Sequence, residues 1–468
     1  MTESRNPSFW ATVRSAVGGA HGQDFTEGPV GRALILLAVP MVLEVALESV
    51  FAVVNIIWVS RLGAEAASIV GVTESMFSLI YGLGMGLGIG ATAIVARRIG
   101  EKRPDQAADV AVQAILLGIL ISIPIALVGG IGAPSLLRVM GTPEDVIGHG
   151  VGYTRLLFSG NVVVLLLFLI NAIFRGAGDA AVAMRCLWIA NICNMILDPL
   201  LIFGLGPFPK LGVTGAAVAT TLGRGVGVLY QFYRLAGTDR RFVIRAGHLK
   251  VDLGVMKTLI RLSVNGVFQI LIGTASWIGL VRVIATFGKE AIAGYTIAIR
   301  VVLFALLPAW GMSNAAATMV GQSLGAKKPD RAEQAVWKAG YYNLIFLGLI
   351  GVLFFALAPR MMAAIVPGDP LVVHYGTQAV RIVSCGFLFY AYGMVISNAF
   401  NGAGDTRTPT LLNLLCFWCW EIPLAWILAK TLGFGPSGVF WAITIAFSTL
   451  AVLSALVFRR GKWKLRSV

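Results

Sequence analysis

The chain has 468 residues, of which 57% are hydrophobic and only 13% charged, and its formal net charge is +15. So few charges cannot cover the surface of a soluble protein of this size, so the composition excludes a water-soluble globular protein and indicates a chain surrounded by lipid. The HExxH motif is absent and the four histidines form no metal-ligand pair, which argues against an enzyme.

In chain order, about twelve stretches are long and apolar enough to cross a hydrocarbon core of about 30 Å as helices. These are 33–60, 66–96, 106–132, 147–174, 182–205, 211–236, 257–287, 290–322, 333–357, 372–400, 407–430 and 437–458. The alternating pattern of a membrane barrel is missing. We therefore predict an all-α polytopic membrane protein. Residues 1–30 form a tail without a cleavable signal peptide, in which 7–17 is either a short interfacial helix or disordered.

The second half of the chain repeats the first. Three short motifs recur about 225 residues later: Gly63-Ala-Glu-Ala as Gly288-Lys-Glu-Ala, Gly100-Glu-Lys-Arg-Pro-Asp as Gly325-Ala-Lys-Lys-Pro-Asp, and Phe174-Arg-Gly-Ala-Gly-Asp as Phe400-Asn-Gly-Ala-Gly-Asp. Parallel repeats with six spans each are typical of transporters, which hold their site between like halves. We predict an N-lobe at 31–236, a linker at 237–254, a C-lobe at 255–460 and a basic tail at 461–468.

Positive charge is unevenly distributed along the chain. About 26 of the 37 lysines and arginines fall on one side of the predicted membrane and about seven on the other. This is the positive-inside bias, which predicts that both termini are cytoplasmic in an inner (plasma) membrane of bacterial type. The same distribution argues against nucleic-acid binding.

Three local patterns have structural explanations. Asp179 and Asp405 end the repeated Gly-Ala-Gly-Asp turns, where an aspartate can cap the following helix. The glycines of 82–90 resemble a nucleotide loop, but they lie inside a predicted span, where small residues let helices approach. Cys416 and Cys419 have CxxC spacing without a second pair, and we interpret them as packing residues.

Carboxylates inside predicted spans are candidate functional residues, because an ionisable group is costly there. They are Glu44, Glu48, Asp198 and Glu421. Glu44, Glu48 and Asn55 follow helical spacing and lie on one stripe of the first span. At about 1.5 Å per residue, Glu48, Asn55 and Asp198 lie about 22, 33 and 27 Å from the cytoplasmic end, so they could share a level.

Polar residues accompany Asp198. Asn194 lies one helical turn earlier, Asn171 belongs to the fourth span, and Thr220 to the sixth. A carboxylate with carboxamide and hydroxyl oxygens suits a proton or a hard cation such as Na⁺. A polar clamp between helices, without any transported ion, is the alternative. In the second half, the tryptophans and Met312 indicate either packing or a substrate pocket.

Together these motifs resemble the multidrug and toxic compound extrusion (MATE) family over nearly the whole chain. The resemblance rests on residues 26–32, on 53–63 at the end of the first span, on both Gly-Ala-Gly-Asp turns, and on Asn194-Met-Ile-Leu-Asp198-Pro199. It implies a twelve-helix, two-lobe, V-shaped exporter. Such proteins move amphipathic, often cationic compounds outward in exchange for inward H⁺ or Na⁺.

The resemblance also implies a cation site in the N-lobe. Asn171, Asn194 and Asp198 match the family pattern, and Thr220 supplies its threonine. Asn55 stands where the family has an aspartate, and Gln269 is the one polar candidate where other members place a glutamate. We hypothesise that Glu48, two turns before Asn55, supplies the missing carboxylate. Two carboxylates in a medium of low dielectric cannot both stay charged, which favours a proton over a permanently bound Na⁺.

The sequence thus predicts secondary-active efflux of multiple drugs or organic cations by antiport, with alternating access between two lobes. The alternative is a flippase or exporter of an amphipathic or lipid-linked metabolite; a membrane-embedded enzyme and a channel or scaffold fit less well. No cofactor or metal is expected beyond the coupling ion, H⁺ or Na⁺, the latter at Asp198 and Asn194. We expect a monomer in lipid that binds no nucleic acid. Substrate-cavity candidates are Glu44, Gln269, Trp277, Met312 and Glu421.

Overall fold

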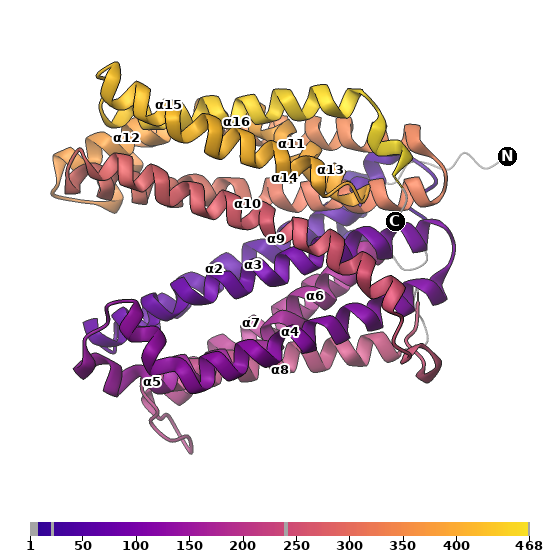
Figure 1. The fold of residues 1–468 in the computed structure, drawn as a ribbon, viewed down its shortest axis with the longest axis horizontal. Helices are drawn as coiled ribbons and strands as arrows, with labels where there is room; N and C mark the ends of the chain where they lie inside the picture. Colours follow the sequence, from indigo (N-terminus) through magenta and orange to yellow (C-terminus); the bar gives the residue numbers. More distant parts are fainter. Residues whose placement is uncertain (1–7, 20–22, 238–241, 467–468) are drawn as a thin grey trace. The chain divides into compact units, whose positions relative to one another are not determined.

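The computed structural model describes residues 8–19, 23–237 and 242–466. The rest of the predicted tails, at 1–7, 20–22 and 467–468, and residues 238–241 of the predicted linker lie outside this part of the chain. Within the described ranges the regular structure is helical, which confirms the all-α prediction (Figure 1). The tail contains the short helix α1 (Phe9–Gly18), whose first turn is capped by Ser8.

The first half of the chain contains seven long helices. They are α2 (Val30–Ser60), α3 (Ala64–Gly100), α4 (Pro104–Val139), α5 (Glu144–Ser159), α6 (Asn161–Ala177), α7 (Ala180–Phe203) and α8 (Val213–Ala236). The second half repeats this order. Its helices are α9 (Leu253–Ala285), α10 (Lys289–Gly325), α11 (Pro329–Ile365), α12 (Pro370–Cys385), α13 (Phe387–Gly402), α14 (Arg407–Asn413), the π-helical η2 (Leu414–Glu421), α15 (Ile422–Trp426), the π-helical η3 (Ile427–Thr431) and α16 (Pro436–Arg459).

Nine described helices are long and apolar enough to cross a membrane, and there are eleven such spans if each bent pair counts as one. The bent pairs are α5 with α6, at 41°, and α12 with α13, at 59°. The remaining predicted span is α8, a 24-residue helix with two arginines. The count therefore agrees with the twelve predicted stretches, except that two of them are broken, at Gly160 and at Gly386.

The repeated turns at 100–104 and 325–329 have the same backbone conformation at their equivalent lysines. Lys102 and Lys327 are the only non-glycine residues with positive φ in the described ranges, at 58° and 57°. Each residue in this left-handed conformation ends a long helix. Pro104 and Pro329 then begin the next helix, where the missing N–H of a proline costs no hydrogen bond.

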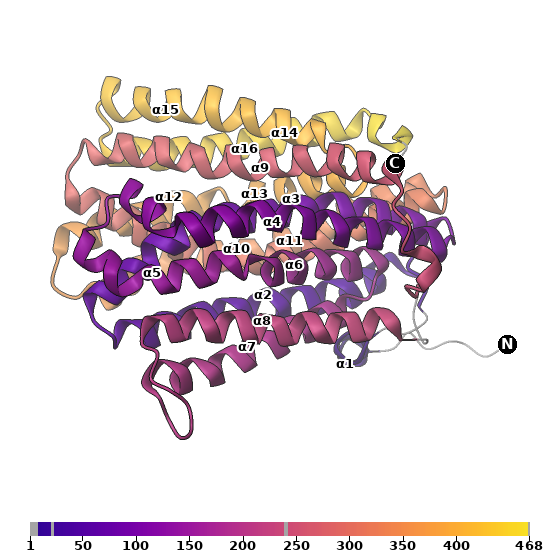
Figure 2. The same ribbon diagram turned by 60° about the horizontal axis from the view of Figure 1, so that its bottom comes forward.

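The chain folds into two compact units. Unit 1 comprises Met1–Gln23 and Leu43–Val267, and unit 2 comprises Asp24–Val42 and Phe268–Val468. Helix α2 therefore passes from unit 2 to unit 1 at residues 42–43, and α9 passes from unit 1 to unit 2 at the equivalent positions of the repeat. Each unit has its own apolar core. Figure 2 shows the same helices turned by 60° about the horizontal axis.

Glycines allow close helix packing inside each unit. In unit 1 the glycines of 82–90 are buried in α3, and a Cβ atom at Gly86 would lie 2.5 Å from the backbone nitrogen of Val267. In unit 2 a Cβ atom at Gly311 would lie 2.9 Å from the backbone nitrogen of Val42. This glycine run therefore lies within a helix and serves packing, as the sequence indicated.

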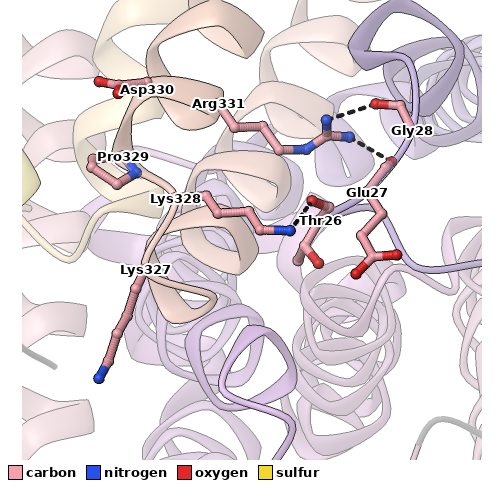
Figure 3. Close-up of a pocket in the computed structure, with 8 residues that line it drawn as sticks. All are labelled: Thr26, Glu27, Gly28, Lys327, Lys328, Pro329, Asp330 and Arg331. Atoms are coloured by element: carbon pink, nitrogen blue, oxygen red, sulfur yellow. Dashed lines mark hydrogen bonds between the residues drawn. The ribbon is translucent and has the colours of Figure 1, made fainter.

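The segment before α2 is fixed to the start of α11 inside unit 2, at a surface pocket (Figure 3). The Arg331 guanidinium donates hydrogen bonds to the carbonyl oxygens of Phe25, Glu27 and Gly28, and Lys328 donates to that of Thr26. Five carbonyl contacts to two cations fix this segment.

Candidate functional site

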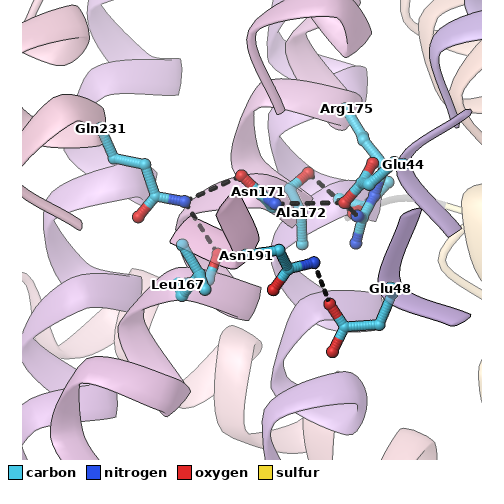
Figure 4. A network of polar contacts seen from close by, with 9 residues as sticks. Glu44, Glu48, Leu167, Asn171, Ala172, Arg175, Asn191 and Gln231 are labelled. Carbon is cyan, nitrogen blue, oxygen red and sulfur yellow. Dashed lines mark hydrogen bonds and ion pairs between the residues drawn. The ribbon is translucent and has the colours of Figure 1, made fainter. Parts of the chain in front are cut away.

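Helix α2 presents two carboxylates to polar partners in unit 1. Glu44 is buried and accepts hydrogen bonds from Arg175 Nη1 at 2.8 Å and from Asn171 Nδ2 at 3.1 Å (Figure 4). Asn171 Oδ1 accepts in turn from Gln231 Nε2 at 2.8 Å. Helices α2, α6 and α8 are thus joined through one network in which the charge of Glu44 is balanced by Arg175.

Glu48, one turn later, has a separate set of partners. Asn191 Nδ2 donates to Glu48 at 2.8 Å, and Arg224 Nη2 lies 3.4 Å from its other oxygen. Arg224 is only 2% exposed, and its guanidinium stands over the rings of Tyr81 and Phe168 at 5.4 and 5.7 Å. Its Nε and Nη1 atoms make no hydrogen bond of good geometry. Glu48 is therefore neutralised by a buried arginine that also interacts with Tyr81.

Asp198 is fully buried and belongs to a third cluster, on α7 and α8. One orientation of the Asn194 side-chain amide allows hydrogen bonds with both Asp198 and Thr220. Its nitrogen then donates to Asp198 Oδ2 at 2.8 Å, and its oxygen accepts from Thr220 Oγ1 at 2.9 Å and from Thr220 N at 3.0 Å. Asp198 makes no ion pair in the described part of the chain, which distinguishes it from Glu44 and Glu48.

Small residues on α8 allow this third cluster to form. A Cβ atom at Gly223 would lie 2.9 Å from the backbone nitrogen of Asn194, and one at Gly215 would lie 2.5 Å from the carbonyl oxygen of Leu201. Because α8 has no side chain at these positions, its backbone approaches α7 closely. That approach brings the backbone N–H of Thr220 within reach of Asn194.

The predicted site residues therefore divide into groups. Asn194, Asp198 and Thr220 lie together, whereas Asn171 joins Glu44. Asn55 is buried on α2, and its Oδ1 has no hydrogen-bond partner. Glu48 and Asp198 contact different groups. That the two carboxylates share one proton remains a prediction.

Unit 2 contains four of the five candidates predicted for a substrate cavity, and the fifth, Glu44, lies in unit 1. Gln269 donates to Asn401 Oδ1 at 3.0 Å and to the carbonyl oxygen of Thr406 at 3.1 Å, and it accepts from Asn401 Nδ2 at 3.1 Å. Trp277 packs against the apolar core, and Met312 is half-buried on α10. Glu421 is 1% exposed, and neither of its carboxyl oxygens has a hydrogen-bond partner within the described ranges. A role of these residues in substrate binding remains a prediction.

The aspartates of the two Gly-Ala-Gly-Asp turns differ in their placement. Asp179 is at the N-cap position of α7, where its carbonyl oxygen accepts from Val182 N and Ala183 N. Asp405 lies one residue before the N-cap of α14. Its side chain accepts from Thr408 Oγ1 at 2.7 Å and is 3.4 Å from Arg466. Both residues occupy helix starts in equivalent turns.

Sequence reasoning missed three of the polar partners in unit 1: Arg175, Asn191 and Arg224. Arg224 lies in the predicted span 211–236, so the rule that selected Glu48, a charged residue inside a span, applies to it equally. Arg175 lies inside the repeated turn motif, and Asn191 is one turn before Asn194. Which carboxylate each one contacts depends on helix packing, which no spacing in the sequence reveals.

The MatE family model matches two segments of the chain, residues 40–200 and 267–427. A probable multidrug resistance protein, YoeA of Bacillus subtilis, is 26% identical over 94% of this chain and 95% of its own length. An FAD transporter of Shewanella oneidensis is 25% identical over 85% and 88%. The solved structure of a multidrug resistance MATE family transporter of the MOP superfamily, in an outward-facing conformation, is 26% identical with a TM-score of 0.87, and the match covers 93% of this chain and 97% of that one.

Proposed function

Since the chain belongs to the MatE family of membrane transporters, we propose that it exports amphipathic organic cations in exchange for H⁺, with Asp198 as the residue that binds the proton. The observation that carries this proposal is the contrast between Glu44, Glu48 and Asp198, the three candidate carboxylates of unit 1. Arginines balance Glu44 and Glu48, whereas Asp198 accepts from the Asn194 amide and makes no ion pair in the part of the chain that the structure describes. A carboxylate without a fixed counter-ion is free to exchange a mobile cation.

Asn194 offers a way for the proton to alter helix contacts. While Asp198 is ionised, the Asn194 amide nitrogen donates to it and the amide oxygen accepts from Thr220. A protonated Asp198 would donate its O–H to the Asn194 oxygen, which requires the amide to turn over. The Asn194 nitrogen would then face the backbone N–H of Thr220, and two donors repel. Protonation therefore weakens the contact between α7 and α8.

Na⁺ is less favoured by the same geometry. A hard cation prefers several oxygen ligands. In the orientation that satisfies Thr220, the Asn194 nitrogen points at both carboxyl oxygens and occupies the position of such an ion. We propose that H⁺ is the coupling ion, and that its binding and release drive alternating access by movement of the two units.

The test uses protein reconstituted into liposomes with an imposed pH gradient, with and without Na⁺, and the fluorescent cation ethidium as substrate. Asp198→Asn is expected to reduce gradient-driven ethidium transport at least about tenfold, because the variant cannot bind the proton. The matched control is Asp145→Asn, an exposed aspartate at the start of α5. Full transport by the Asp198 variant, or dependence on Na⁺ instead of the pH gradient, contradicts the proposal.

A second candidate function is export of an anionic aromatic metabolite. Arg224 favours it, because a buried guanidinium that faces two aromatic rings suits a flat anionic group. One relative of the chain is an FAD transporter. The candidate is supported if FAD competes with ethidium for transport by the wild type and this competition is lost in the Arg224→Gln/Glu48→Gln double variant. If FAD does not compete at all, FAD is excluded as a substrate.

We also propose an inner-membrane location with both termini cytoplasmic, based on the distribution of lysine and arginine. All five cysteines of the chain are free and can be replaced, so single cysteines can be introduced near residues 8 and 466. A membrane-impermeant maleimide should label both only in inverted vesicles. Labelling of either position in right-side-out vesicles contradicts this topology.

A further inference from the structure

Glu421 is buried in unit 2 in surroundings that cannot support its charge. It is 1% exposed, and both of its carboxyl oxygens lack a hydrogen-bond partner among the described residues. No cation pairs with it in that part of the chain. An ionised carboxylate without donors, packed among apolar groups, is far less stable than the neutral acid. These surroundings therefore favour the protonated form of Glu421.

The titratable groups facing Glu421 come from three elements. Tyr295 of α10, Tyr390 of α13 and Cys416 of η2 each interact electrostatically with it. None is a cation, and none of the described groups donates a hydrogen bond to the carboxyl oxygens of Glu421. Tyr295, Tyr390 and Cys416 are themselves buried, and Tyr295 is stacked on Phe440. Such close packing leaves a proton as the ligand, since a proton needs no cavity.

Glu421 occupies a place in its half of the chain close to that of Asp198 in the other half. Each acid lies in the helical span that follows a Gly-Ala-Gly-Asp turn. Asp198 directly precedes Pro199, and Glu421 stands two residues before Pro423. In each unit, therefore, a buried carboxylate without an ion pair among the described residues lies next to a proline in the same span of the repeat.

The backbone around Glu421 can change its winding. Residues Leu414–Glu421 and Ile427–Thr431 are π-helical, a rare form that is found mostly as short insertions at functional sites. Pro423 has no N–H to hold the next turn in place. A shift of hydrogen bonding from the π to the α pattern rotates Glu421 about the helix axis. Such a rotation would change the groups that surround the carboxyl group, and with them its ability to release a proton.

We propose that Glu421 is a second proton-binding site, in unit 2, which binds and releases H⁺ during the transport cycle. The proposal rests on the proton-coupled function argued above, and adds a proton carried by the other unit. The reaction is the reversible binding of H⁺ to the carboxylate, with the released proton passing to water. No further co-reactant is needed.

The experiment measures protons released when ethidium is added to purified, weakly buffered protein. The wild type is compared with Glu421→Gln, Asp198→Asn and the double variant, and with Glu65→Gln as a matched control at an exposed position of α3. Each single substitution should remove part of the release, and the double variant should abolish it. Glu65→Gln should leave the release unchanged.

Normal release from Glu421→Gln, with reduced release from Asp198→Asn, overturns the second site and leaves the proposed function intact. The reverse pattern supports Glu421 and overturns the role of Asp198. Infrared spectroscopy gives an independent check that does not depend on transport. The wild type should show a protonated-carboxyl band at neutral pH that Glu421→Gln lacks, and the band should weaken on ethidium binding. A band that ethidium leaves unchanged identifies a permanently neutral acid and overturns the proposal.

Discussion

Arg175 and Glu44 form a largely buried ion pair of 2.8 Å at the repeat positions where unit 2 has Asn401 and Gln269. The two pairs connect the same elements in each unit, the first span and the helix before the Gly-Ala-Gly-Asp turn. One unit uses a charged pair and the other uses two amides that donate to each other at 3.0 and 3.1 Å. The position therefore requires hydrogen bonding between helices, and charge is specific to unit 1.

Replacing one member of the ion pair should destabilise the protein more than replacing both. Glu44→Gln leaves the Arg175 charge without its partner, which should cost about 2–3 kcal/mol, less than for a fully buried pair because Arg175 keeps some exposure. Adding Arg175→Asn recreates the amide pair of unit 2 and should recover at least half of that loss. Thermal unfolding in detergent, followed by tryptophan fluorescence, measures both. If the double variant lost as much stability as the two single variants together, this account would be contradicted.

The close approach of α3 and α9 in unit 1 predicts the effect of adding one methyl group. In Gly86→Ala the new Cβ would meet backbone atoms of Val267 at 2.5 and 2.8 Å, which cannot move aside as a side chain could. Overpacking of this kind costs about 1–3 kcal/mol. Gly71→Ala, on the same helix with nothing within 4 Å, is the matched control and should raise stability slightly. Equal melting temperatures for the two variants would refute the packing argument.

Much of this fold follows from the sequence for a simple reason. A run of apolar residues long enough to cross a bilayer must be a helix, because lipid offers no partners for backbone N–H and C=O groups. The repeated motifs likewise predict two similar halves. The breaks at Gly160 and Gly386 and the π-helical winding before Glu421 were not predictable, since they depend on contacts that helices make after they pack.

The site was predicted in part, and the reason differs from residue to residue. Asn194 and Asp198 are one turn apart on one helix, so their proximity follows from helical spacing alone. The partners of Glu48 come from α7 and α8, and their identity depends on how three helices meet. Helix packing likewise gives Glu48 and Asp198 different partners, although the sequence predicts similar depths for both.

The contacts of Arg331 predict how firmly the segment before α2 is held in unit 2. Arg331→Gln removes hydrogen bonds to the carbonyl oxygens of Phe25, Glu27 and Gly28. Charge-assisted bonds of this kind contribute about 1.5 kcal/mol or more each, so cleavage by a glutamate-specific protease after Glu27 should accelerate at least about tenfold. The control is Arg460→Gln, an exposed arginine after α16. Unchanged cleavage in the Arg331 variant would show that other contacts hold the segment.

Adjacent threonines on α8 offer a sharp test of the Asp198 cluster. Thr220→Val removes the hydroxyl that donates to the Asn194 oxygen at 2.9 Å and leaves the backbone N–H as the remaining donor. Loss of one such bond is worth about 1 kcal/mol, so proton-driven ethidium transport should fall about fivefold. Thr220→Ser should restore it, and Thr221→Val, whose side chain lies against Gly160, should leave it unchanged. Equal losses in the two valine variants would mean that the effect comes from helix packing and that the hydroxyl of Thr220 has no part in proton coupling.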